Sequence, residues 1–233
     1  MLISHRYRFI FLKTEKTAST SILRALRAIV RETDTLLPAD QKTRARLLRE
    51  HGSLDGFSFE ARATGRRRLL PGLIGLHRHA RAKDVRAFIG PKLFDDYLVV
   101  TSERNPWDRQ VSLYAHRHRE KSGFRLASFD RDMRSPLYNF FHYNRLNNWS
   151  IYTINETVCA DLVIRYENLA EDFRVFLNRV GIPLEKAALT NARASERPRD
   201  HDYRQLYSPA SQALVAGWYR REIDRFGYTF AGD

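Results

Sequence analysis

The chain has 233 residues, of which 43% are hydrophobic and 12% are aromatic. These values exclude a disordered chain and predict one globular domain over residues 1–233 with a sizeable core. The formal net charge of +13 at pH 7 indicates an anionic partner, such as a nucleic acid, an anionic lipid, or a substrate that carries phosphate or sulfate.

Buried strands and amphipathic helices alternate along the chain. Continuous apolar runs predict three strands, over residues 7–12, 97–102 and 161–166. Apolar residues at helical spacing and end signals predict helices over residues 20–32, 80–89, 106–118 and 168–180, and a last helix that starts at Ser208 and continues past Ile223. Residues 33–72 are polar and arginine-rich, with a short helix expected near 41–50, and residues 121–148 show no clear periodicity.

This alternation, with strands that are apolar throughout, is typical of a parallel sheet covered by helices on both faces. The sequence therefore predicts an α/β fold of three layers with a central parallel sheet flanked by helices. In such sheets, ligands bind beyond the carboxyl ends of the strands. The polar motifs KTEKTASTS (13–21) and SERNPWDR (102–109) both follow predicted strands, so we expect them to form one shared site.

The first motif has the composition of a phosphate-binding turn. If Ala18 to Ser21 form the turn into the next helix, their backbone N–H groups lack intrahelical acceptors and the helix dipole favours an anion there. Ser19, Thr20 and Ser21 add hydroxyl groups, and Lys16 adds a positive charge. The turn is not a Walker A loop, because it has no glycine and its lysine comes before the turn. The simpler alternative is a helix start capped by Ser or Thr.

The second motif repeats this arrangement. Arg104 comes directly after a predicted strand, and Ser112 lies one to two turns into the following helix, with Arg109 between them. Arg104 and Ser112 can therefore contact a second phosphate. The alternative for Arg104 is a surface ion pair with Glu103 or Asp108.

Four stretches in this order resemble the sulfotransferase family: KTASTS (16–21), SERNPWDRQVSLY (102–114), VIRYENLAEDFRVFLNRVGI (163–182) and YRREIDRFGYTF (219–230). The likeness is greatest to the carbohydrate branch, which includes bacterial enzymes and the Golgi chondroitin and heparan sulfotransferases. It covers most of the chain and is weakest over residues 33–72 and 121–148.

The resemblance implies a P-loop-like α/β fold and a metal-independent reaction with the donor 3′-phosphoadenosine 5′-phosphosulfate (PAPS). Lys16, Thr17, Ala18, Ser19, Thr20 and Ser21 match the family's 5′-phosphosulfate loop. Arg104 and Ser112 match its contacts to the 3′-phosphate. The chain departs from the family at Glu15, where proline is common before the loop lysine.

Sulfuryl transfer to a hydroxyl requires stabilisation of the leaving phosphate and a base that removes the hydroxyl proton. Lys16 is the candidate for the first role. For the base, the stretch GLHRHARAKDVRAFIG (75–90) offers His77 and His79. The family's histidine precedes a helix of similar sequence, and this match favours His79. In an extended segment the two histidines point to opposite faces, so only one of them can enter the site.

The acceptor is expected to be a carbohydrate or glycolipid. The arginines of residues 62–68 and 121–143 suit an acidic sugar chain, and Trp107, Tyr138, Phe140 and Tyr143 are candidates to stack on sugar rings, although ordinary packing explains them equally well. A P-loop-type kinase that acts on a small molecule and a basic nucleic-acid-binding protein are the alternatives. The kinase needs Walker glycines and a carboxylate for Mg²⁺, and a nucleic-acid-binding role does not explain two oxyanion motifs at strand ends.

Cys159, the one cysteine, excludes a disulfide within the chain and a cysteine-based zinc site. The apolar run near the N-terminus is too short to span a membrane, and no signal-peptide cleavage site follows it. We therefore expect a cytoplasmic protein whose positive charge also suits peripheral contact with a membrane.

Overall fold

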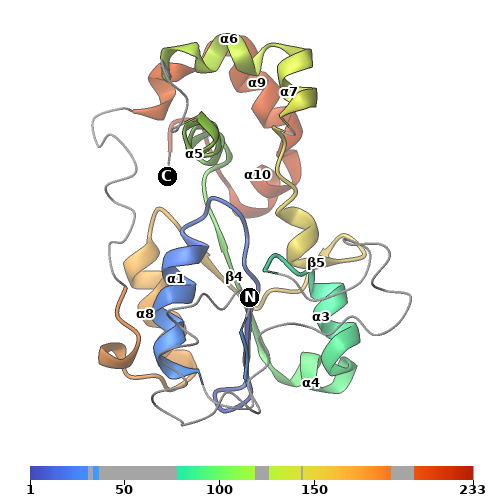
Figure 1. Ribbon diagram of the computed structural model, residues 1–233, viewed down its shortest axis with the longest axis vertical. Coiled ribbons are helices and arrows are strands. Elements are labelled where there is room, and N and C mark those ends of the chain that lie inside the picture. The colour runs from blue at the N-terminus through green and yellow to red at the C-terminus, as the bar shows by residue number, and fades with distance from the viewer. Residues whose placement is uncertain (31–33, 37–77, 119–125, 143, 190–201, 233) are drawn as a thin grey trace. The chain divides into compact units, whose positions relative to one another are not determined.

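A computed structural model describes residues 1–30, 34–36, 78–118, 126–142, 144–189 and 202–232 (Figure 1). The chain divides into two compact units. Unit 1 comprises Met1–Ser102 and Ser150–Thr190, and unit 2 comprises Glu103–Trp149 and Asn191–Asp233. The fold is mixed α/β, with the main sheet in unit 1. The short helix predicted near residues 41–50 lies outside the described residues.

The main sheet has five strands in the order β3-β1-β2-β4-β7. They are β1 (Leu2–Ser4), β2 (Phe9–Phe11), β3 (Thr35–Leu36), β4 (Leu98–Glu103) and β7 (Leu162–Arg165). The three predicted strands are therefore confirmed as β2, β4 and β7. β2 and β4 are parallel, with Phe9 opposite Leu98 and Phe11 opposite Val100.

The expectation of a parallel sheet is wrong at one edge, because β1 runs antiparallel to both β2 and β3. Strand β1 is only three residues long, and the chain reverses after it in a short turn whose last residue, Arg8, has a φ of 51°. A second sheet, formed by β5 (Thr153–Ile154) and β6 (Thr157–Val158), is an antiparallel hairpin. Asn155 and Glu156 both have positive φ in its turn, which is the backbone conformation that two-residue hairpins favour.

Helices flank the main sheet of unit 1 (Figure 1). They are α1 (Ser19–Leu26), α3 (Ala82–Ile89), α4 (Pro91–Asp96) and α8 (Leu169–Arg179), with 3-10 turns at Arg27–Ile29 and Leu184–Lys186. Phe9 and Phe11 of β2 share one core with residues of α1 and α8, and the rings of Phe9 and Phe176 meet edge to face at 5.1 Å. Helix α4 was not predicted. Gly90 and Pro91 indicate the end of the preceding helix in the sequence, but in the structure Pro91 lies in the first turn of a new helix.

The described part of unit 2 is helical apart from the end of β4. It contains α5 (Pro106–His118), α6 (Phe129–Met133), α7 (Pro136–Phe141), α9 (Pro209–Trp218) and α10 (Arg220–Phe226), with 3-10 turns at Leu126–Ser128 and Tyr203–Leu206 and another at Trp149–Ile151, where the units join. Helix α5 has the predicted bounds. The last predicted helix is two helices separated at Tyr219, and Gly227 ends the second with a φ of 70°. Trp107, Tyr114 and Phe129 contribute to the core of this unit.

Candidate functional site

Residues 13–21, which we call the 13–21 loop, join the carboxyl end of β2 to α1. The backbone N–H of Leu12 donates to the carbonyl oxygen of Val100 at 2.8 Å, and the Thr101 hydroxyl donates to the carbonyl oxygen of Leu12 at 3.1 Å. The loop therefore begins beside β4, at the sheet edge where the sequence predicts an oxyanion site.

Three buried hydroxyls support the base of this loop. Thr14 Oγ1 lies 2.7 Å from Thr17 Oγ1 and 3.1 Å from Ser102 Oγ, and Thr17 Oγ1 lies 2.9 Å from Ser102 Oγ. Thr14 also donates to the carbonyl oxygen of Ser102 at 2.5 Å. Thr17, predicted to bind the donor, therefore has its side chain directed into the protein and offers a ligand its backbone only. Thr14 and Ser102 were missed as positioning residues, because their contact joins two segments far apart in the sequence.

The turn into α1 is not capped by a side chain. Ala18 occupies the N-cap position with a left-handed backbone (φ 60°, ψ 6°), and no side-chain hydrogen bond caps the helix. Lys16 is also left-handed, with a φ of 63°. Such conformations cost of order 1–3 kcal/mol in residues other than glycine and are concentrated at functional sites. The alternative of an ordinary Ser/Thr cap is therefore wrong. The N–H of Ser21 donates to the carbonyl oxygen of Ala18 at 2.8 Å, contrary to the sequence expectation, so the N–H groups of Ser19 and Thr20 are the candidates to bind an anion.

The hydroxyls of this turn have different environments. Ser19 is buried and donates to the carbonyl oxygen of Thr14 at 2.5 Å, so its hydroxyl proton is used within the loop. Thr20 and Ser21 are half-buried at the start of α1. Of the three hydroxyls expected to donate to a phosphate, Thr20 and Ser21 are therefore the better placed.

His79 is held against the same loop. Its Nδ1 lies 2.7 Å from the carbonyl oxygen of Lys13. A carbonyl oxygen only accepts hydrogen bonds, so Nδ1 carries the proton and Nε2 of the neutral ring carries the lone pair. This tautomer is the one that a base acting through Nε2 requires. His77 lies outside the described residues, so the choice between the two histidines stays a prediction.

The environment of His79 favours its neutral form. Burial lowers the pKa of His79 to about 3, and the positive charges of Lys13 and Arg78 act in the same direction, whereas the hydrogen bond to the Lys13 carbonyl opposes them. The imidazole is therefore uncharged at neutral pH and able to accept a proton. Its basicity is low, chiefly because the ring is buried and also because Lys13 places positive charge beside it.

The hydroxyl network predicts that the buried hydroxyl of Thr17 contributes more to the stability of the protein than the half-buried hydroxyl of Thr20. Thr17→Val keeps the side-chain volume but removes a buried hydroxyl from Thr14 and Ser102, so the free energy of unfolding is expected to fall by about 1–3 kcal/mol. Thr20→Val, in the same turn but half-buried, is expected to change it by less than about 0.5 kcal/mol. Urea unfolding of both variants measures the difference, and equal losses would contradict the proposed support of the loop.

Apart from Ser102, the second motif belongs to unit 2. Arg104 is buried and its Nε donates to a carboxylate oxygen of Asp108 at 2.7 Å, with a second hydrogen bond from the guanidinium to the same carboxylate. The partner Asp108 that the sequence offered as an alternative is therefore confirmed, but the ion pair is buried and not on the surface. Ser112 is half-buried one turn further along α5, on the same helix face as Asp108. A phosphate at Arg104 would share its guanidinium with Asp108.

The side chain of Arg109 is occupied by contacts within the protein. It is fully buried, donates to Glu103 at 2.5 Å and to Glu222 at 3.4 Å, and lies 4.5 Å from the centre of the Tyr219 ring. These contacts join α5 to α10 within unit 2, so Arg109 is not available to a ligand in this structure.

The aromatic residues proposed to stack on sugars differ in exposure. Trp107 is buried and its indole N–H donates to the carbonyl oxygen of Gln212 at 3.0 Å. Tyr138 packs on His142 with ring centres 4.2 Å apart. Phe140 is 74% exposed, whereas Tyr143 lies outside the described residues. Packing therefore explains Trp107 and Tyr138, and Phe140 remains open to a partner.

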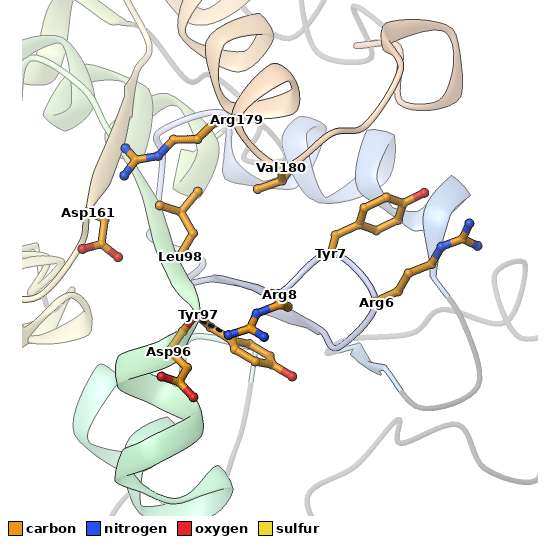
Figure 2. Close-up of a pocket in the computed structure, with 9 residues that line it drawn as sticks. All are labelled: Arg6, Tyr7, Arg8, Asp96, Tyr97, Leu98, Asp161, Arg179 and Val180. Carbon is orange, nitrogen blue, oxygen red and sulfur yellow. Dashed lines mark hydrogen bonds between the residues drawn. The ribbon is translucent and has the colours of Figure 1, made fainter.

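An open pocket of about 570 Å³ lies elsewhere in unit 1, next to the turn before β2 and the start of β4 (Figure 2). Arg8 lies over the ring of Tyr97 and donates to the carbonyl oxygen of Asp96 at 3.4 Å. Nine residues line the pocket: Arg6, Tyr7, Arg8, Asp96, Tyr97, Leu98, Asp161, Arg179 and Val180. The pocket is at the amino ends of β2 and β4, opposite the 13–21 loop, and contains no predicted site residue.

Among the described residues, no cluster of three or more His, Cys, Asp or Glu side chains is suited to hold a metal ion. None of the helices in the described ranges combines the length and the apolar character that crossing a bilayer requires.

Comparison with known proteins gives one informative relative. No family model matches the chain, and no solved structure matches it. An uncharacterized protein of Archaeoglobus fulgidus is 37% identical over 118 residues, which are 49% of this chain and 93% of the archaeal protein. Since the match covers nearly the whole of that relative, the chain belongs to the same family as this archaeal protein.

Proposed function

We propose that the protein transfers a sulfuryl group from PAPS to a hydroxyl of a carbohydrate or glycolipid, on a P-loop-like fold of three layers. The observation that carries the proposal is the uncapped start of α1 at Ala18, with a lysine-containing loop before it and the neutral His79 held against that loop. The resemblance of four sequence stretches to the sulfotransferase family adds the identity of the donor.

The groups of the 13–21 loop are compatible with a phosphosulfate. The backbone N–H groups of Ser19 and Thr20 and the half-buried hydroxyls of Thr20 and Ser21 are donors that suit its oxygens, and the helix dipole favours its charge. Lys13 and Lys16 contribute positive charge from the same loop. The buried network of Thr14, Thr17 and Ser102 holds the loop in place, so little reorganisation is needed when an anion binds.

Two side chains are proposed to act in the reaction. When bound, PAPS supplies the sulfuryl group and an adenosine bisphosphate leaving group. Lys16 stabilises the negative charge that develops on the leaving phosphate. His79 accepts the proton of the acceptor hydroxyl at Nε2, while Nδ1–H remains bonded to the Lys13 carbonyl and holds the ring in orientation.

Arg104 and Ser112 are proposed to bind the 3′-phosphate, and this part rests on the resemblance. Arg104→Ala is expected to weaken binding of adenosine 3′,5′-bisphosphate by about 1.5–3 kcal/mol, the range for a charge-assisted contact. Arg131→Ala removes an exposed arginine that also pairs with a carboxylate and serves as the matched control. Calorimetric titration of both variants measures the loss, and equal affinities would exclude the Arg104 contact.

The acceptor is tested by a transfer screen with ³⁵S-labelled donor over oligosaccharides, glycolipids, phenols and tyrosine peptides. We expect label in a saccharide or glycolipid product without added metal, and none with the His79→Asn variant. Transfer only to simple phenols would refute the carbohydrate assignment. Transfer of phosphate from Mg·ATP, with no transfer of sulfate, would favour a kinase.

A further inference from the structure

Helix α7 (Pro136–Phe141) exposes three large apolar side chains on one face. Leu137 is 70% exposed, Phe140 is 74% exposed and Phe141 is 68% exposed. Their spacing of i, i+3 and i+4 places them together on the helix surface, and the rings of Phe140 and Phe141 are 5.4 Å apart. Single exposed apolar residues are ordinary, but a contiguous group indicates a binding surface.

The remainder of α7 is fixed to unit 2 by polar and ring contacts. The Tyr138 hydroxyl lies 2.9 Å from Nε2 of His118, and Nδ1 of the same ring lies 2.8 Å from the carbonyl oxygen of Tyr114. Asn139 donates to the carbonyl oxygen of Met133 at 2.6 Å, and its own oxygen accepts from Asn144 at 2.9 Å. The apolar face is therefore presented by an anchored helix.

The ion pairs next to α7 expose their arginine side chains to solvent more than their carboxylates. Helix α6 contacts α7 (Figure 1). Two ion pairs lie on α6 and its C-cap residue Arg134, namely Arg131 with Asp132 and Arg134 with Asp130. The guanidinium-bearing side chains are 75% and 51% exposed, whereas their partners are 18% and 26% exposed. Both carboxylates have further partners within the unit: Asp132 accepts from Tyr114 at 2.7 Å, and Asp130 accepts from Ser208 and Ser211 at 2.6 Å.

The area of the apolar face on α7 favours a lipid surface over a second copy of the protein as its partner. Three side chains of this size, about 70% exposed, present roughly 400 Å² of apolar surface. A stable protein interface buries about 800 Å² on each partner, so this face is too small for a dimer by itself. Insertion into the interfacial region of a bilayer needs only a short amphipathic helix with aromatic residues on one face and basic residues beside it.

We propose that α7 is a membrane-contact helix. Leu137, Phe140 and Phe141 insert at the headgroup–acyl boundary of a lipid surface. Arg131 of α6 and Arg134, the residue that follows this helix, pair with its anionic headgroups. The chain's net charge of +13 adds a long-range attraction to such a surface. This role is independent of the proposed donor binding and proton transfer, because it uses none of the residues assigned to them. It replaces the sugar-stacking role that the sequence offered for Phe140.

Vesicle binding tests the proposal. In co-sedimentation with phosphatidylcholine vesicles containing phosphatidylserine, Leu137→Ser/Phe140→Ser/Phe141→Ser is expected to bind at least about tenfold more weakly than the wild type. The matched control is Phe88→Ser/Val175→Ser/Leu184→Ser, which removes three exposed apolar residues of unit 1 and is expected to bind like the wild type. Removing phosphatidylserine from the vesicles is expected to weaken wild-type binding.

A single substitution reports insertion directly and does not depend on the fold of the triple variant. In Phe140→Trp, the emission at position 140 is isolated by subtracting the wild-type spectrum, and it is expected to shift to the blue on addition of the anionic vesicles. Absence of this shift, absence of wild-type binding, or equal binding by the α7 triple variant would overturn the proposal. So would sedimentation velocity that shows a wild-type dimer abolished in that variant, because the face would then be an interface between two copies.

Discussion

Replacing His79 with asparagine is expected to lower kcat by about 10²–10⁴, the usual contribution of a general base. Asparagine retains an N–H close to the position of Nδ1, which can still donate to the Lys13 carbonyl, but it has no group equivalent to Nε2. The 13–21 loop should therefore keep its conformation, and donor affinity should be nearly unchanged. Steady-state kinetics and calorimetry on the same preparation measure both quantities.

The control for His79→Asn is His79→Gln, which has no donor at the Nδ1 position. This variant is expected to lose kcat and also some stability, because the Lys13 carbonyl loses its partner. An active His79→Asn variant together with an inactive His77 variant would reverse the assignment of the base. Activity in both variants would mean that another group removes the proton.

The pH dependence of the reaction gives a second test of His79. Since its pKa in the free protein is lowered to about 3, kcat/KM for the donor should show no acidic limb near pH 6.5, and the limb should lie well below that value. Bound PAPS would offset the positive charge of Lys13, so the limb in kcat is expected at higher pH than the limb in kcat/KM. Both limbs should disappear in His79→Asn, and a limb that persists in that variant would belong to a different group.

The lowered pKa of His79 also makes the stability of the folded protein depend on pH. The folded-state pKa is below the unfolded value of 6.5, so between these values the unfolded chain binds a proton that the folded protein does not. Stability from this group is therefore present above pH 6.5 and is lost as the pH falls from 6.5 toward about 3. His79→Asn should reduce this part of the pH dependence in urea unfolding.

Lys16→Ala is expected to lower kcat by about 10²–10³, the range for removal of one group that stabilises developing charge. Its effect on donor affinity should be smaller, because the charge on the bridging oxygen grows as the sulfur–oxygen bond breaks. The φ of 63° at Lys16 makes alanine a fair comparison, since both residues bear the same backbone strain there.

The control for Lys16 is Lys13→Ala, in the same loop. Lys13 is buried and its charge lowers the pKa of His79, so the substitution should shift the acidic limb toward higher pH. A Lys16→Ala variant with unchanged kcat would contradict the leaving-group role, even if its donor affinity fell.

The elements that the sequence predicted correctly are those with strong local signals. Strands β2, β4 and β7 are apolar throughout, and α5 begins at Pro106, whose fixed φ suits a first helical turn. Strand β1 was missed because three residues show no periodicity, and its antiparallel pairing depends on the turn that follows. Residues 121–148 lacked periodicity because α6 and α7 are only five and six residues long.

The residue types of the candidate site could be predicted from the sequence, but the directions of their side chains and their hydrogen-bond partners could not. The motif shows that hydroxyls gather after β2, but only the fold shows that Thr17 and Ser19 direct theirs inward while α1 starts uncapped at Ala18. The tautomer of His79 depends on a carbonyl 66 positions earlier in the chain, which no local pattern reveals. The Arg104–Asp108 pair was among the alternatives that the sequence offered, but its burial was not foreseeable, because Arg104 precedes α5 and its side chain is placed by the fold of unit 2.

The central claim is that the 13–21 loop binds the donor of sulfuryl transfer without metal, and calorimetric titration with adenosine 3′,5′-bisphosphate in EDTA tests it most directly. The account predicts saturable binding by the wild type that is weaker in Arg104→Ala and nearly unchanged in His79→Asn. No saturable binding in EDTA, together with tight binding of Mg·ATP, would contradict it.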